Sequence, residues 1–168
     1  AIVLVCICLV VSLALAATYN VSNPTIIANQ QKSADEARME VLPDGDSFTE
    51  YDGKLVNGVD DCYIADNKAG MAVTAEYKGF GGAVKVMIGI DANGEITGVK
   101  VTEHSETPGL GTKAADLKQY QGVSEATAGH INDDPNIDAV TGATITSNAV
   151  YGSVVEALAQ FKECGGVK

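Results

Sequence analysis

The sequence has little of what nucleic-acid binding requires. Its 168 residues contain no tryptophan, and its aromatic residues are six tyrosines and three phenylalanines. Lysine and arginine number 11 against 22 aspartates and glutamates, so the formal net charge is −11 at pH 7. Neutralising phosphates requires a basic surface, and stacking on bases requires aromatic rings. The composition therefore argues against a nucleic-acid partner, and the 46% hydrophobic content argues against a disordered chain.

The spacing of the four cysteines excludes the common metal motifs. No CxxC pair and no cysteine–histidine spacing of a metal site occurs, so we predict neither zinc nor an iron–sulfur cluster. Cys6 and Cys8 lie in an apolar N-terminal stretch, which leaves Cys62 and Cys164 in the remainder. These last two either form one disulfide in an oxidising compartment or stay free.

Charge is also missing from the beginning of the chain. Residues 1–17 carry no charge, Ser12 is their only side chain that is not apolar, and the first charged residue is Lys32. Seventeen helical residues span about 25 Å, slightly less than the ~20 residues that usually cross a bilayer. We predict a retained transmembrane anchor at 1–22; the alternative is a cleaved signal peptide with small residues at 14–16. Because the first residue is not methionine, we expect further residues before it.

Two further segments follow the anchor. Residues 23–58 are expected to form a membrane-proximal linker with one short helix, which Ser33 caps and which the Pro-Asp-Gly turn after Leu42 ends. Residues 59–168 are expected to form one folded domain. A single N-terminal anchor followed by one acidic domain most often exports that domain. We therefore expect the domain on the extracytoplasmic side of the cell membrane.

Alternation of apolar side chains predicts strands between Val59 and Thr102. A period of two places one row of side chains on each face of a sheet. The turn-forming residues Asp91–Gly94 join the last two strands, so we expect an antiparallel meander that ends in a hairpin. The alternating positions are Met71, Val73, Ala75 and Tyr77, followed by Val84, Val86, Ile88 and Ile90.

The clearest helix outside the anchor lies at the end of the chain. Apolar residues at spacings of four, four and three predict one buried stripe. These positions are Val150, Val154, Leu158 and Phe161. Thr146, Ser147 or Asn148 can cap its start, and the Gly-Gly pair that follows can end it. Short helices are also expected within 114–120 and 122–134, so the fold class is α+β: a transmembrane helix, then one antiparallel-sheet domain with flanking helices.

The segment 138–147 is the first candidate for chemistry. It is a turn of small and hydroxyl-bearing residues that leads into the last helix. Unpaired N–H groups and the helix dipole favour a phosphate at such a place. Gly142 and Ala143 allow close approach, and the hydroxyl of Thr144 lies where the phosphate would arrive. The alternative is a capped helix start without a ligand.

The segment 104–112 is the second candidate. Pro108 and the two glycines after it fix a loop whose backbone can approach a flat ligand, and Leu110 offers an apolar contact. Taken alone, this loop is also typical of an ordinary turn. A lone loop histidine is more often solvated than bound to a ligand, so we expect His104 to face solvent.

Together, the sequences 106–111 and 138–144 resemble the covalent-FMN domain of respiratory membrane complexes. This family includes the G subunit of the Rnf complex and the C subunit of the sodium-pumping NADH:quinone reductase. Its flavinylation motif is Asp, two residues, Ser or Thr, Gly, Ala, then Ser or Thr, and the sequence Asp-Ala-Val-Thr-Gly-Ala-Thr matches it throughout. The anchor, Arg38 and Pro43 extend the resemblance over nearly the whole chain, and the short length is closer to the Rnf protein.

The resemblance implies FMN bound covalently through a phosphoester to Thr144, which a flavin transferase outside the cytoplasm would form. Asp138, Thr141, Gly142 and Ala143 would be the recognition sequence and the surroundings of the phosphate. The loop against the flavin would consist of Glu106, Thr107, Pro108, Gly109, Leu110 and Gly111. We expect no catalytic side chain and no metal ligand, because outer-sphere electron transfer needs no acid, base or nucleophile.

The implied function is an electron-carrier subunit of a membrane complex that couples NADH–ferredoxin electron transfer to Na⁺ or H⁺ movement. Its implied partners are a second covalent-FMN subunit together with membrane and iron–sulfur subunits. NADH would bind elsewhere, because the chain has no dinucleotide-binding motif. Two alternatives stay open: a free-standing membrane-anchored flavoprotein for extracellular electron transfer, and an extracytoplasmic binding module without a cofactor.

Overall fold

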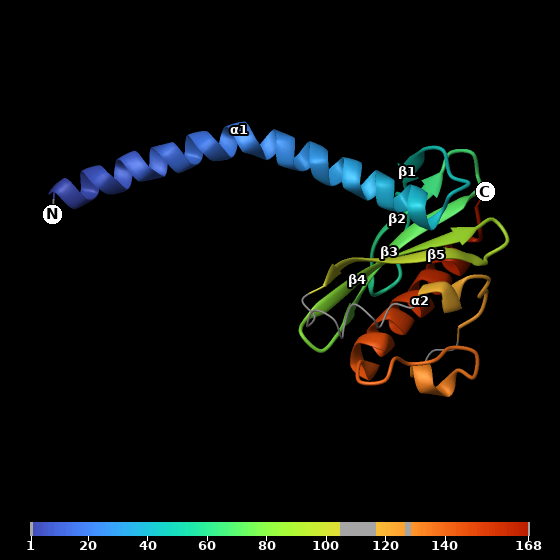
Figure 1. Ribbon diagram of the computed structural model, residues 1–168. Coiled ribbons are helices and arrows are strands. Elements are labelled where there is room, and N and C mark those ends of the chain that lie inside the picture. Colours follow the sequence, from blue (N-terminus) through green and yellow to red (C-terminus); the bar gives the residue numbers. More distant parts are fainter. Residues whose placement is uncertain (1, 105–116, 127–128, 168) are drawn as a thin grey trace. The chain divides into compact units, whose positions relative to one another are not determined.

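The protein divides into two compact units, at residues 1–36 and 37–168. The structure is a computed structural model that describes residues 2–104, 117–126 and 129–167 (Figure 1). The first unit is helical, and the second contains a β-sheet and a long C-terminal helix. The observed secondary structure confirms the α+β class.

Helix α1 runs from Ile2 to Val41 without a break. It is long and apolar enough to cross a membrane by length and composition. The predicted separate helix that begins at a Ser33 cap is wrong, because Ser33 lies inside α1. Extending an existing helix adds one hydrogen bond for each residue fixed, so a capping residue within it does not start a new one. The end of the helix before Pro43 is confirmed, whereas the segment boundaries at 22 and 58 stay predictions.

The sheet is an antiparallel meander with the strand order β1-β2-β3-β4-β5. The expected hairpin is confirmed: the Asp91–Gly94 turn joins the last two strands, with Gly94 at a φ of 89°. The short strand β1 was not predicted, since three residues are too few to show a period of two. The strands are β1 (Phe48–Glu50), β2 (Val59–Ala65), β3 (Gly70–Lys78), β4 (Ala83–Asp91) and β5 (Ile96–His104).

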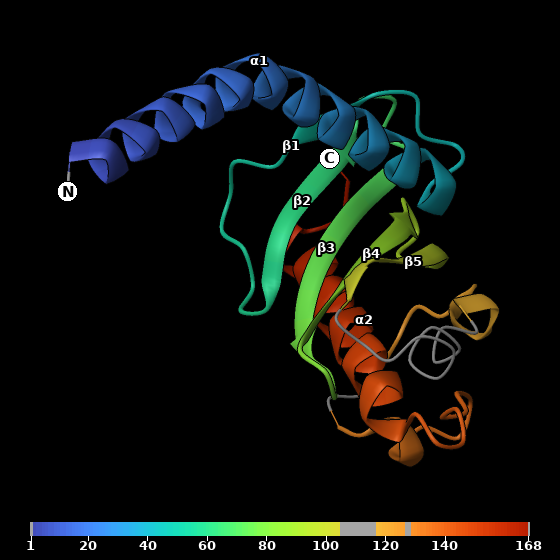
Figure 2. The ribbon, with the colours of Figure 1, turned by 60° about the vertical axis from the view of Figure 1, so that its left-hand side comes forward.

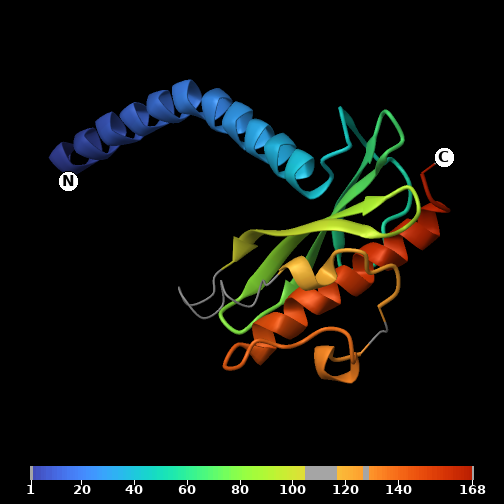
Figure 3. The ribbon, with the colours of Figure 1, turned by 45° about the vertical axis from the view of Figure 1, so that its right-hand side comes forward.

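Helix α2 (Thr144–Cys164) packs along one face of the sheet, which we call the helix face (Figure 3). The predicted stripe is confirmed: Val150, Val154 and Leu158 are buried, and Phe161 is partly buried against the same core. The alternating residues of the strands supply the opposite wall, and Val73, Val86 and Ile88 are fully buried there. The helix ends at Gly165, whose φ of 69° is left-handed, as the Gly-Gly pair predicts.

The opposite face of the sheet, which we call the glycine face, receives the last turn of α1. Gly89 of β4 and Gly98 of β5 are register partners on this face. A Cβ atom on Gly89 would lie 2.1 Å from the carbonyl oxygen of Val41, so only glycine admits this approach. The same carbonyl accepts a hydrogen bond from the Thr97 hydroxyl. Figure 2 shows the sheet between α2 and this end of α1.

Between β5 and α2, the described residues around the 3₁₀ helix η2 (Leu117–Tyr120) pack against β5 at the edge of the sheet. Helix η2 and a second 3₁₀ helix, η3 (Ile131–Asp133), confirm the expected short helices. Backbone hydrogen bonds join Ile96 to both Gly122 and Val123. These bonds fasten the chain after η2 to the start of β5.

Candidate functional site

Thr144 is the first residue of α2, and its side chain is exposed. The turn before it is closed by a hydrogen bond from the Ala143 amide to the Val140 carbonyl oxygen, at 2.9 Å. Gly142 has a φ of 86°, a conformation that a residue with a side chain rarely adopts. The structure thus brings Thr141, Gly142, Ala143 and Thr144 together in one tight turn, with Ala143 buried beneath it.

The start of α2 differs from the prediction. The N-cap residue is Ala143, whose methyl group cannot accept a hydrogen bond, so the predicted caps Thr146, Ser147 and Asn148 are wrong and lie inside the helix. Two of them hold the preceding chain instead. Ser147 Oγ accepts a hydrogen bond from the Val140 amide at 3.1 Å, and Asn148 Oδ1 accepts one from the Ile131 amide at 2.9 Å.

This arrangement suits a negatively charged group beside Thr144. The first turn of a helix presents backbone N–H groups, and the helix dipole concentrates partial positive charge there. A phosphate group that is bonded to the Thr144 oxygen would lie at this end of a 21-residue helix. The exposed hydroxyl and the tight glycine turn fit the phosphate end of FMN.

Asp138 is held through its backbone. The Asp138 amide donates to Gln119 Oε1 at 3.0 Å, and Gln119 Nε2 donates to the Asp138 carbonyl oxygen at 3.2 Å. Neither bond involves the side-chain carboxylate of Asp138, which is exposed. Sequence reasoning missed Gln119, because nothing in the motif points to a partner 19 residues away.

Two buried tyrosines, Tyr120 and Tyr151, belong to the core cluster that also contains Val150 of α2. Tyr120 is fully buried, and burial raises the pKa of its phenol, with Tyr151 and Asp134 adding to the shift. The Tyr151 hydroxyl donates to Asp134 Oδ2 at 3.0 Å. Tyr120 therefore stays neutral at physiological pH.

The second predicted segment, 106–111, lies outside the described residues. His104 is the last residue of β5 and is the register partner of Val84. The contact between this loop and a flavin therefore stays a prediction.

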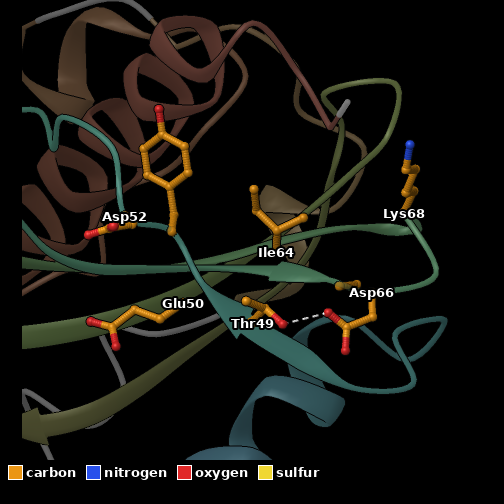
Figure 4. Close-up of a pocket in the computed structure, with 8 residues that line it drawn as sticks. Thr49, Glu50, Asp52, Ile64, Asp66 and Lys68 are labelled. Carbon is orange, nitrogen blue, oxygen red and sulfur yellow. Dashed lines mark hydrogen bonds between the residues drawn. The ribbon is translucent and has the colours of Figure 1, made fainter.

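A pocket of about 320 Å³ lies elsewhere, between β1 and β2. Figure 4 shows Thr49 pointing toward Asp66, whose carboxylate accepts hydrogen bonds from the hydroxyls of Ser47 and Thr49, both at 2.7 Å. These bonds lower the pKa of Asp66. The pocket combines carboxylates with Lys68, and none of the predicted site residues that the structure describes lines it.

Comparisons with known proteins point to one family. A model of the FMN-binding domain matches residues 79–159, which include Thr144. The chain is 31% identical to the G subunit of the proton-translocating ferredoxin:NAD(+) oxidoreductase complex of Clostridium ljungdahlii, over 96% of this chain and 89% of that protein. It is 34% identical to the G subunit of the Na(+)-translocating ferredoxin:NAD(+) oxidoreductase complex of Acetobacterium woodii, over 86% and 82%. Identity to the G subunit of the ion-translocating oxidoreductase complex of Escherichia coli O157:H7 is 37%, over 52% of each chain.

Proposed function

The chain belongs to the family of G subunits of ion-translocating ferredoxin:NAD(+) oxidoreductase complexes, and from this premise we propose that it carries electrons through FMN bonded covalently to Thr144. It is a redox subunit of an ion-translocating complex, and FMN is its cofactor. The flavin supplies the electron-transfer chemistry, and the protein binds and orients it. The exposed Thr144 hydroxyl at the start of α2 is the observation that carries the covalent assignment.

The proposed linkage is a phosphoester between the Thr144 oxygen and the phosphorus of FMN. Relative to free FMN and the unmodified chain, its formation removes one molecule of water. The resulting phosphodiester keeps one negative charge, which the N-terminus of α2 stabilises through its N–H groups and dipole. Asp138, Thr141 and Gly142 belong to the sequence that the transferase recognises, and Gly142 keeps the approach to the oxygen clear.

The proposed partners are a second covalent-FMN subunit together with membrane and iron–sulfur subunits of the same complex. A flavin transferase is required for maturation. We place the folded domain on the extracytoplasmic side, since α1 provides one N-terminal apolar helix and the domain that follows is acidic. A tethered flavin suits this role because it cannot diffuse away from the membrane complex.

The test is the intact mass of the denatured full chain, with flavin fluorescence in the gel, from cells that contain the transferase. The wild-type chain should carry the mass of FMN less one water on the peptide that contains Thr144. Thr144→Ala should lose all covalent flavin, and Thr144→Ser should keep a part of it, because serine retains the oxygen. Thr102→Ala is the matched control: this exposed hydroxyl lies on β5, outside the 138–144 motif, and the variant should keep full flavin content.

Two outcomes would contradict the proposal. Covalent flavin on Thr144→Ala would place the attachment at another residue. An unmodified wild-type chain would favour a binding module without a cofactor, in which Thr144 only begins a helix. Co-purification with polytopic membrane subunits separates a complex subunit from a free-standing electron carrier.

A further inference from the structure

Two cysteines that are far apart in the sequence meet at one end of the domain. Cys62 lies on β2 and is 1% exposed, and Cys164 is the last residue of α2. Cys164 packs against the core cluster that contains Cys62, and Cys164 is among the groups that raise the pKa of the Cys62 thiol. In Figures 1 and 2 the C-terminal end of the chain lies beside β1 and β2. Among the described residues these thiols are free.

Cys164 is held in this place by its neighbours. Its sulfur accepts a hydrogen bond from Gln160 Nε2 at 3.2 Å, and Gln160 is fully buried. Gln160 also bonds the backbone of the segment before β2, accepting from the Val56 amide and donating to the Lys54 carbonyl oxygen. Tyr51 contacts the same thiol, and this hydrogen bond raises the pKa of the Tyr51 phenol. These contacts hold the end of α2 against the segment that precedes β2.

We propose that Cys62 and Cys164 form a disulfide that fastens the C-terminal end of α2 to β2. Both S–H bonds break and one S–S bond forms. The two protons and the two electrons reduce the disulfide of an oxidant to two thiol groups. The oxidant is a disulfide compound, either glutathione disulfide or a thiol–disulfide oxidoreductase.

The burial of the two thiols sets the order of the two steps. Cys164 is half-buried, so its thiolate attacks the disulfide of the oxidant first and forms a mixed disulfide. Burial raises the pKa of the Cys62 thiol to about 12, with Cys164 adding to the shift, so Cys62 attacks no external partner. Cys62 instead attacks the Cys164 sulfur and releases the reduced oxidant. The finished disulfide is shielded from reductants on the Cys62 side.

The proposed disulfide and the proposed flavin attachment lie at different ends of α2. From Thr144 to Cys164, α2 extends about 30 Å, so the two features occupy opposite ends of one helix. The proposal does not depend on the proposed covalent flavin, and each is measured by a different change in mass. It adds a covalent tie at the end of α2 that the cofactor does not reach.

The experiment uses the full chain in detergent, with and without incubation with glutathione disulfide. The protein is then denatured and alkylated, and its intact mass is measured. Of the four cysteines, two should be alkylated after oxidation and four after reduction with dithiothreitol. The peptides that contain Cys62 and Cys164 should appear joined. Oxidation should raise Tm by roughly 10 °C, because the bond closes a loop of about 100 residues.

Matched variants distinguish this bond from other oxidation. Cys164→Ser should abolish both the joined peptides and the rise in Tm, and its half-buried position lets the variant fold. Cys8→Ser, in the exposed apolar part of α1, should keep both. Four alkylated cysteines after oxidation, or a bond that joins Cys62 to any other cysteine, would overturn the proposal. Flavin fluorescence on the same samples should not change with oxidation.

Discussion

The two faces of the sheet are packed in different ways. The helix face is filled by large aliphatic side chains, since Leu158 and Val154 of α2 lie against Val86 and Ile88. The glycine face has a smaller buried cluster, which consists of Ala37, Val41, Ala72 and Met87. Strand β4 contributes residues to both faces of the sheet: Ile88 lies on the helix face and Gly89 lies on the glycine face.

Burial of side chains and close approach of backbones are therefore two separate ways to hold a helix against a sheet. On the helix face, stability comes from the apolar volume removed from water. On the glycine face, the backbone of Val41 rests directly on the backbone of the sheet, where Gly89 and Gly98 leave no side chain between them. Removing side-chain volume on the helix face should therefore lower stability, and adding side-chain volume on the glycine face should lower it as well.

Leu158→Ala should have the largest effect on stability. Leu158 is 3% exposed, and truncation leaves a cavity beneath α2 that should lower the free energy of unfolding by about 3 kcal/mol. Urea denaturation of the full chain in detergent, followed by circular dichroism, measures this change. Ile145→Ala is the control on the same helix: Ile145 is 52% exposed, and its loss should cost only a few tenths of a kcal/mol. Equal losses for the two variants would remove the distinction between filled core and surface.

Gly89→Ala tests the other face by adding a single methyl group. The new Cβ would clash with the Val41 carbonyl, so we expect a loss of about 2 kcal/mol. Loosening of α1 should also expose Arg38, which is 8% exposed, to trypsin. Gly129→Ala is the control, because the nearest atom to its Cβ is an Asp133 oxygen at an ordinary 3.5 Å. Unchanged trypsin cleavage in Gly89→Ala would show that the close approach is unimportant.

Thr97→Val should have the smallest effect of the three. It removes the hydroxyl that bonds the Val41 carbonyl and keeps the shape of the side chain, so the loss should be about 1 kcal/mol. Thr102→Val is the control on the same strand, since its hydroxyl makes a longer, exposed bond to the Lys85 carbonyl at 3.3 Å. The difference between the urea midpoints of Thr97→Val and Thr102→Val measures the contribution of the Thr97–Val41 hydrogen bond. Identical midpoints would show that this bond does not help to hold α1.

The sequence predicted the helix face well for a physical reason. Alternation along β3 and β4 and the stripe on α2 both report which side chains are buried, and burial alone decides that face. The turn at Asp91–Gly94 was equally predictable, because its residues favour a tight connection. The glycine face gave no such signal: Gly89 and Gly98 look like breaks in strands until Val41 is brought against them.

The candidate site was predicted only in part. The motif places Thr141–Thr144 before a helix, and the structure begins α2 at Thr144. The capping residues were predicted wrongly, since a Ser or Thr near a helix start can bond backward to a preceding loop, as Ser147 does to Val140. The support from Gln119 depends on a tertiary contact that no local pattern encodes.

The exposure of Thr144 allows the flavin to be attached after the domain has folded. Its side chain faces solvent while Ala143 and Ser147 beside it are buried, so no core residue has to move for an enzyme to reach the hydroxyl. On the proposed attachment, folding comes first and the flavin second. Folded apoprotein then accumulates before flavinylation, and the amount of flavinylated protein depends on how often the apoprotein encounters the transferase.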